Sequence, residues 1–152
     1  MFSQTAEYAL RACVYLAMRP DEALTTQQIS EKTRVPSAYL SKVLQSLVRA
    51  GLVHSQRGFG GGFQLTNACG EVTILEIVNA VDPICRIETC PLGLESHGRN
   101  LCPLHKKMDD ALRSIQEAFG TTTLEQVIHP PAGAGKVVSV PLTNSDGRVP
   151  AN

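Results

Sequence analysis

The 152-residue chain contains no tryptophan, and aromatic residues make up only 5% of it. Its apolar residues are mainly small and aliphatic, which suits a core built from short helices. The chain also lacks the run of about 20 apolar residues that a membrane-spanning helix needs. Glu7 and Arg11 interrupt the apolar residues near the N-terminus, so this segment is not expected to be a signal peptide. These absences predict one small, mainly helical protein without a membrane span.

Net charge is also absent, because 14 Lys and Arg residues balance 14 Asp and Glu residues. The charges are unevenly placed, since no acidic residue occurs from residue 32 to residue 70. The basic residues of this acid-free segment are Lys32, Arg34, Lys42, Arg49 and Arg57. Such segregation indicates a positively charged face, which is typical of proteins that bind nucleic acid.

The acid-free segment includes the pattern of a helix-turn-helix. Thr25 and Gln28 form a capping-box pattern that predicts a short helix ending near Thr33. Pro36 then suits the first turn of a second helix, which is expected to end at about residue 50. The outward face of that helix is small, hydrogen-bonding or basic, as in a helix that enters the major groove of DNA. The predicted DNA contacts on the two helices are Thr26, Ser37, Ala38, Tyr39, Ser41, Lys42, Gln45 and Arg49.

A glycine-rich hairpin is predicted directly after these helices. Short strands are expected at 52–53 and 63–65, and the glycines between them permit the backbone angles of a tight tip. Arg57 at the base of the tip is predicted to reach a groove or a phosphate of the DNA, and Gly60 and Gly61 are also predicted DNA contacts. Polar helix faces are often only solvated, and glycine hairpins are often only turns. Their order and their shared acid-free segment nevertheless favour a winged helix-turn-helix that binds double-stranded DNA.

Apolar periodicity predicts four further helices. They are expected at 2–18, 73–81, 102–119 and 123–129. The long helix carries more apolar surface than a small winged helix can cover, so we expect it to pair with its counterpart in a second subunit. A homodimer of this kind suits a palindromic operator. The predicted organisation is a winged helix-turn-helix domain over 1–82, a cysteine-rich loop over 83–101, a dimerisation helix and short last helix over 102–129, and a disordered tail over 130–152.

Three of the five cysteines lie between the winged helix and the long helix, namely Cys85, Cys90 and Cys102, and His105 follows. An odd number of cysteines without a secretory signal favours the reducing cytoplasm and argues against disulfides. Cys102 precedes Pro103 at the expected start of the long helix, where the helix N-terminus favours a thiolate. Three soft ligands at this place suit an iron–sulfur cluster or zinc.

Two interpretations without a metal stay open for these cysteines: they are free thiols with no role, or Cys90 and Cys102 form a thiol switch. A cysteine–histidine nucleophile is also conceivable. No residue pattern of a substrate pocket or an oxyanion hole accompanies it, so we do not expect an enzyme.

The sequence resembles the family of winged-helix transcription factors that includes the iron–sulfur regulator IscR and the nitric-oxide-sensing repressor NsrR. The resemblance covers residues 1–120. It rests on the opening TAEYALRACVYLA, the helix YLSKVLQSLVRAGLV, the wing RGFGGGFQL and the three-cysteine loop before the long helix. It implies a homodimeric DNA-binding regulator, usually a repressor. It also implies that a 2Fe–2S or 4Fe–4S cluster controls operator affinity in response to nitric oxide, redox state or iron–sulfur status.

The resemblance also implies a set of cluster ligands. These are Cys85, Cys90, Cys102 and, as the fourth ligand, either His105 or Glu7 of the partner subunit. The family has two gaps of five residues between its cysteines, whereas this chain has gaps of four and eleven, which makes Cys85 the weakest candidate. His97 in the longer gap is a further potential ligand. The alternatives are an exposed ion pair with Arg11 for Glu7 and simple exposure on the helix surface for His105.

Overall fold

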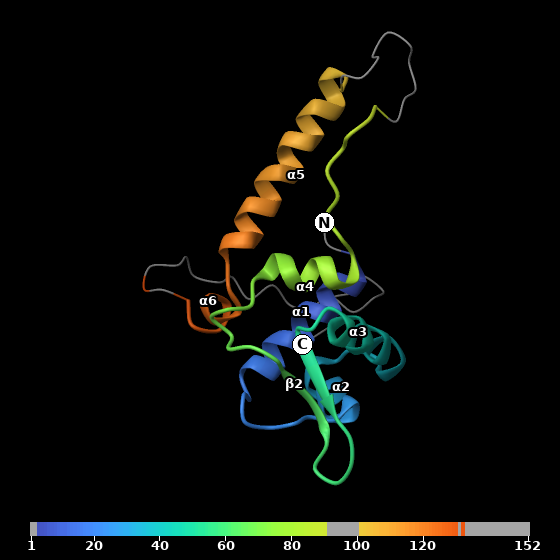
Figure 1. The fold of residues 1–152 in the computed structure, drawn as a ribbon, viewed down its shortest axis with the longest axis vertical. Coiled ribbons are helices and arrows are strands. Elements are labelled where there is room, and N and C mark those ends of the chain that lie inside the picture. The colour runs from blue at the N-terminus through green and yellow to red at the C-terminus, as the bar shows by residue number, and fades with distance from the viewer. Residues whose placement is uncertain (1–2, 91–100, 131, 133–152) are drawn as a thin grey trace, which may run out of the picture.

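The computed structural model describes residues 3–90, 101–130 and 132, and in these ranges the chain forms six helices and one two-stranded sheet (Figure 1). The elements are α1 (Gln4–Ala17), α2 (Thr26–Thr33), α3 (Ser37–Arg49), β1 (Val53–Gln56), β2 (Gly62–Leu65), α4 (Ile74–Val81), α5 (Pro103–Thr121) and α6 (Leu124–Ile128). The predicted fold class, mainly helical with a small two-stranded wing, is confirmed. His97 and almost all of the predicted tail lie outside the described residues.

Side-chain caps determine where several helices begin. Thr25, Thr73 and Thr123 each accept a hydrogen bond from the backbone N–H three residues on, and the side chain of that third residue caps the threonine in return. These reciprocal capping boxes satisfy backbone donors that would otherwise have no partner. At its other end α2 stops at Arg34, whose φ of 57° is left-handed and turns the chain toward α3.

The core surrounds α1, which packs against α2, α3, α4 and α6. Ala6, Ala9 and Ala12 of α1 are almost completely buried, and their small side chains allow the neighbouring helices to approach closely. Large aliphatic side chains fill the remaining space, and the largest fully buried ones are Leu16, Ile29, Leu40, Leu44, Leu47, Ile77 and Leu124. The core is therefore aliphatic, as the shortage of aromatic residues predicts.

The wing is the antiparallel pair of β1 and β2, in which Val53 is opposite Leu65 and Gln56 is opposite Gly62. The prediction for the first strand was wrong: the strand starts at Val53 and continues to Gln56, whereas 52–53 was expected. After Val53 the strand is exposed and polar, so it lacks the apolar alternation by which a sequence reveals a strand. An isolated bridge between Leu24 and Phe63 holds the base of the wing against the body.

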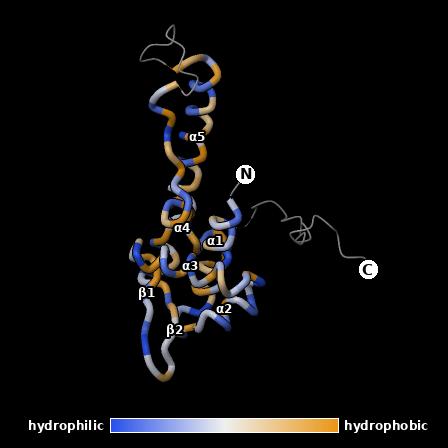
Figure 2. Tube along the Cα trace, turned by 90° about the vertical axis from the view of Figure 1, so that its right-hand side faces the viewer, coloured by the Kyte–Doolittle hydropathy of each residue, from blue (hydrophilic) through white to orange (hydrophobic). Residues whose placement is uncertain are grey.

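Helix α5 projects from the body, and its N-terminal end lies opposite the wing (Figures 1 and 2). Its C-terminal end is anchored, because the backbone N–H of Ile74 donates to the Thr122 carbonyl oxygen at 2.9 Å. His105 is the only buried residue of α5, whereas Leu104, Met108 and Ile115 are exposed by 59%, 47% and 37%. Among the described residues, much of the apolar side of α5 therefore has no packing partner.

The last helix, α6, does not extend α5 away from the body. Leu124 is fully buried among the core residues, and its backbone N–H donates to the Val72 carbonyl oxygen at 2.9 Å. Thr123 also forms a bridge with Thr73. α6 thus packs against the winged helix-turn-helix domain, whereas the predicted organisation places it with the long helix in the segment 102–129. None of the helices in the described ranges is both long enough and apolar enough to cross a membrane.

Candidate functional site

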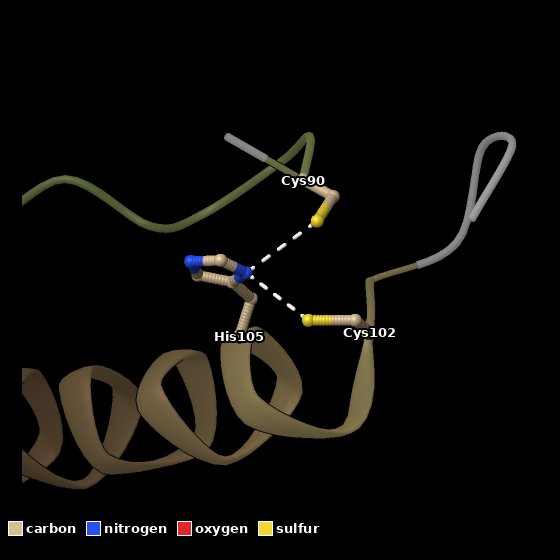
Figure 3. A group of neighbouring side chains, drawn as sticks. All are labelled: Cys90, Cys102 and His105. Carbon is tan, nitrogen blue, oxygen red and sulfur yellow. Dashed lines mark hydrogen bonds between the residues drawn. The ribbon is translucent and has the colours of Figure 1, made fainter. Parts of the chain in front are cut away.

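Three side chains that can bind a metal meet at the first turn of α5 (Figure 3). Nδ1 of His105 lies 3.2 Å from Sγ of Cys102 and 3.4 Å from Sγ of Cys90. All three donor atoms lie within 4.8 Å of one another. Cys102 and His105 are buried and Cys90 is half-buried. The three residues form a compact Cys–Cys–His group, which we call the Cys–His site.

The start of α5 explains how two members of the Cys–His site come together. Cys102 is the N-cap, Pro103 occupies the first turn, and His105 is three residues after the cap. A side chain at that position points back toward the N-terminus of the helix and so reaches the cap residue. The backbone N–H of His105 is the largest cause of a lowered pKa of the Cys102 thiol; burial opposes it, and Cys90 also favours the thiolate. A thiolate is the form in which cysteine binds metals.

The third member, Cys90, is held near α5 by a set of hydrogen bonds that we call the Asp109 clasp. The Arg86 guanidinium donates two hydrogen bonds to the Asp109 carboxylate, and the backbone N–H of Ile87 donates to Asp109 Oδ1 at 3.0 Å. Farther along α5, the Gln116 side chain donates to the Ile84 carbonyl oxygen at 2.7 Å. The hydrogen bond from Arg86 is the main reason that the pKa of Asp109 is about 2, so this carboxylate stays charged at neutral pH. The clasp aligns the segment before Cys90 with the helix that carries His105.

We expect the substitution Asp109→Ala to release Cys90 from the Cys–His site. The substitution removes the acceptors of Arg86 and Ile87, so the Cys90 thiol should react several-fold faster with iodoacetamide in the metal-free protein. Peptide mass spectrometry after short alkylation times measures this rate. Asp110→Ala is the matched control, because Asp110 pairs with Lys106 and Arg113 on its own helix. Equal Cys90 alkylation rates in Asp109→Ala and the wild type would show that the clasp does not hold the loop.

Two other predicted ligands are not part of the Cys–His site. Cys85 is exposed and lies outside the group. Glu7 on α1 forms an ion pair with Arg11, as the alternative interpretation expects, and α1 lies in the body and not beside the start of α5 (Figure 1). Since the sequence predicts Glu7 of the partner subunit as a ligand, its distance within one chain does not test that prediction.

The remaining two cysteines belong to the body. Cys13 is completely buried in α1, and burial raises the pKa of its thiol to about 12, so it remains a neutral core residue. Cys69 is half-buried and packs against the core. Neither residue is in the Cys–His site.

The donor set of the Cys–His site fits a metal centre. Two sulfurs and an imidazole nitrogen are suitable for zinc and for the irons of a cluster. Zinc–sulfur bonds of about 2.3 Å and zinc–nitrogen bonds of about 2.0 Å place tetrahedral ligands roughly 3.5 Å apart, close to the distances of 3.2 Å and 3.4 Å found here. A cluster takes the same donors but spreads them over several irons. Within the described ranges, no fourth histidine, cysteine or acidic group joins the three.

The predicted DNA-binding helix presents the expected face to solvent. The inward side of α3 consists of Leu40, Val43, Leu44 and Leu47, all of them buried. On the other side, Ala38, Lys42, Gln45 and Arg49 are exposed. The Ser37 hydroxyl donates to Ser30 Oγ at 3.0 Å, a bond that joins the start of α3 to α2. The turn between the helices is thereby fixed while the basic face of α3 remains accessible.

The other predicted DNA contacts lie around this face with differing accessibility. Ser37, Tyr39, Arg57 and Gly60 are exposed, whereas Thr26, Ser41 and Gly61 are half-buried. The Tyr39 ring also lies 6.2 Å from the Tyr8 ring of α1, measured between centroids. A hollow between α3 and the wing is lined by Gln45, Val48, Arg49, Ser55 and Phe63. The helix and the wing therefore form one continuous surface.

Comparison with known proteins gives matches over most of the chain. The model of the Rrf2 family, described as an iron-dependent transcriptional regulator, matches residues 2–130. An HTH-type transcriptional regulator of Aquifex aeolicus is 31% identical over 132 residues, which are 85% of this chain and 92% of that protein. IscR of T. potens superposes with a TM-score of 0.70 at 20% identity, covering 84% of this chain and 85% of that one. CymR, the global cysteine regulator of B. subtilis, superposes with a TM-score of 0.69 at 22% identity, covering 84% and 95%.

Proposed function

Since the chain belongs to the Rrf2 family of transcriptional regulators, we propose that it is a homodimeric repressor whose affinity for a palindromic operator is controlled by an iron–sulfur cluster. Regulators of this family are not enzymes, and this chain is likewise a transcriptional regulator. The observation that carries the cluster proposal is the meeting of Cys90, Cys102 and His105 at one end of α5. The signal would be nitric oxide, redox state or iron–sulfur status.

In the proposed complex, α3 lies in the major groove and the wing contacts the adjacent backbone. The exposed side chains of Lys42, Gln45 and Arg49 support this arrangement, because they can bond to base edges and phosphates. The acid-free segment supports it as well, since no carboxylate between residues 32 and 70 would repel the phosphates. Serine side chains and backbone groups near the helix-turn-helix would add hydrogen bonds to the DNA that involve no charged side chain.

This proposal predicts a steep salt dependence of DNA binding. The logarithm of the dissociation constant, measured by fluorescence anisotropy, should rise linearly with the logarithm of the salt concentration. Lys42→Ala and Arg57→Ala should each reduce that slope by about one, because each removes one phosphate contact. Lys107→Ala on α5 is the control and should leave the slope unchanged. Binding that is insensitive to salt would contradict DNA recognition by this face.

The homodimer is proposed because of the exposed apolar side chains of α5. Leu104, Met108 and Ile115 follow one another at helical spacing on one side of the helix and are exposed in the single chain. A second copy of α5 offers the same surface, so two chains can cover each other through a self-complementary interface. Such a dimer would bring two α3 helices to the two half-sites of a palindrome.

We propose Cys90, Cys102 and His105 as cluster ligands, with Cys85 and Glu7 of the partner subunit as candidates for completing the set. When bound, a cluster would supply a redox-active centre that reacts with oxidants or nitric oxide. The chain's own residues would hold its sulfur and nitrogen donors in place through the first turn of α5 and the Asp109 clasp. The lowered pKa of Cys102 supports ligation by this residue, because metals bind the thiolate.

The proposed coupling passes along α5, because the start of α5, where the Cys–His site lies, and the wing are at opposite ends of the molecule (Figure 1). Ligation by Cys90 on the loop and by Cys102 and His105 on α5 would join these two segments. A change in this ligation would alter how two α5 helices pack against each other. The spacing of the two α3 helices on the operator would change as a result. Loss of the cluster would therefore change operator affinity without any contact between the cluster and DNA.

A zinc-stabilised or metal-free thiol regulator is the second candidate. The distances of 3.2 Å and 3.4 Å to Nδ1 of His105 are also compatible with a single tetrahedral ion. Elemental analysis distinguishes these candidates from the cluster regulator. Zinc without sulfide indicates the zinc-stabilised regulator, and the absence of both zinc and iron indicates the metal-free thiol regulator.

A further inference from the structure

The tip of the wing displays a phenylalanine in solvent. Phe59 is fully exposed, more so than any other large apolar residue of the described ranges. Its ring has no place in the core, and the fold gains nothing from an apolar side chain at this position. Burying a phenylalanine ring contributes on the order of 2 kcal/mol, so this ring can stabilise a complex in which a partner covers it.

The turn that carries Phe59 has a defined conformation. The backbone N–H of Gly61 donates to the Gly58 carbonyl oxygen at 3.0 Å, which closes a four-residue turn with Phe59 at its second position. Gly60, the third residue, has φ +75°, as a type II turn requires. At Gly61 a Cβ would lie 2.3 Å from the Gln56 carbonyl oxygen, so the tip cannot accept a larger residue there. The hydrogen-bonded turn therefore presents Phe59 at its outer corner.

The surroundings of Phe59 favour DNA as its partner. Arg57 precedes it by two residues and is exposed, and the nearest acidic residues in sequence are Glu31 and Glu71. The wing forms one surface with α3, and its tip projects beyond the body (Figures 1 and 2). When α3 lies in the major groove, a hairpin that extends beyond it reaches the neighbouring minor groove. Proteins that bind the minor groove frequently insert apolar side chains as wedges between base steps and so kink the duplex.

We propose that Phe59 is a DNA-binding residue whose ring enters the minor groove of the operator and partly unstacks one base step. The inference rests on the proposed DNA-binding function and adds a contact of a different kind. Arg57 would contact a phosphate and so contribute to salt dependence. The ring would contribute through stacking and exclusion of water, and would favour easily deformed pyrimidine–purine steps.

The test uses the full-length protein and a duplex that the wild type selects from a random-sequence library. Phe59→Ala should weaken binding to that duplex roughly 10-fold, the size of one lost base–aromatic contact, without changing the salt slope. Phe59→Leu, which keeps an apolar wedge, should recover part of the affinity. With 2-aminopurine at the base step beneath the wing, wild-type binding should raise the fluorescence, and Phe59→Ala should abolish that rise.

The outcomes separate this inference from the proposed function. If the wild type selects no duplex, DNA binding itself is wrong and the role of Phe59 fails with it. If the wild type binds, and Phe59→Ala binds equally well with the same 2-aminopurine signal, only the wedge is refuted. An unchanged melting temperature of Phe59→Ala, expected for an exposed side chain, would show that any loss of affinity is not caused by unfolding.

Discussion

Replacing Cys102 with serine should remove most of the bound iron and sulfide and, at the same time, change operator affinity. Serine is a good N-cap residue, so α5 should still begin at Pro103. The soft thiolate donor is lost, however, and with it one of the three donor atoms that lie within 4.8 Å of one another. We expect metal affinity to fall by more than about 10-fold, since even second-shell changes have effects of 10- to 100-fold.

The measurement is iron and sulfide per subunit after anaerobic purification, together with an operator titration of the same sample. Cys69→Ser is the matched control, because Cys69 packs against the core of the body and lies outside the Cys–His site. It should retain more metal than Cys102→Ser. Wild-type iron content in Cys102→Ser would remove Cys102 from the ligand set. Lost iron with unchanged operator affinity would break the proposed link between the site and DNA.

The substitution Met108→Glu should convert the protein into a monomer and weaken operator binding on the order of 100-fold or more. Met108 lies in the middle of the exposed apolar side of α5 and is itself 47% exposed in the single chain. In the proposed dimer it would be buried, and burying an unpaired carboxylate there is very unfavourable. A dimer binds two half-sites at once, and this linkage commonly contributes 10²- to 10⁴-fold in affinity.

Analytical ultracentrifugation measures the mass of Met108→Glu, and anisotropy with the selected duplex measures its affinity. Arg113→Glu is the control, because Arg113 is exposed on the other side of α5 and the same acidic side chain is introduced there. That variant should remain a dimer. If Met108→Glu is also a dimer with wild-type affinity, the two chains associate through another surface.

The sequence predicts those parts of the fold that depend on local chemistry. The capping pattern of Thr25 and Gln28 marks the start of α2, and the structure has the reciprocal hydrogen bonds that define it. The apolar spacing of α3 predicts which of its faces is buried, since four leucine and valine side chains recur at helical intervals. By contrast, β1 is longer than predicted, because its exposed polar residues are held only by the ladder with β2.

The Cys–His site could be predicted only in part. The spacing from Cys102 to His105 is short and helical, so their contact follows once α5 begins at Pro103. The Asp109 clasp could not be predicted, because Arg86 and Asp109 are 23 residues apart and no periodic pattern links them. The packing of Leu124 in the core could not be predicted either, since a helix of five residues is too short to show which neighbour buries it. The sequence does mark Phe59 as a large apolar residue among four glycines. Its proposed role, however, depends on the exposure of the side chain, which only the structure shows.

The most direct test of the account is to purify the protein without oxygen and to measure iron, sulfide, visible absorbance and operator affinity before and after the metal is removed with a chelator. The account predicts a coloured dimer that contains iron and sulfide and whose affinity for the selected duplex changes when they are lost. A colourless protein without iron, which binds the duplex equally well before and after chelation, would contradict it.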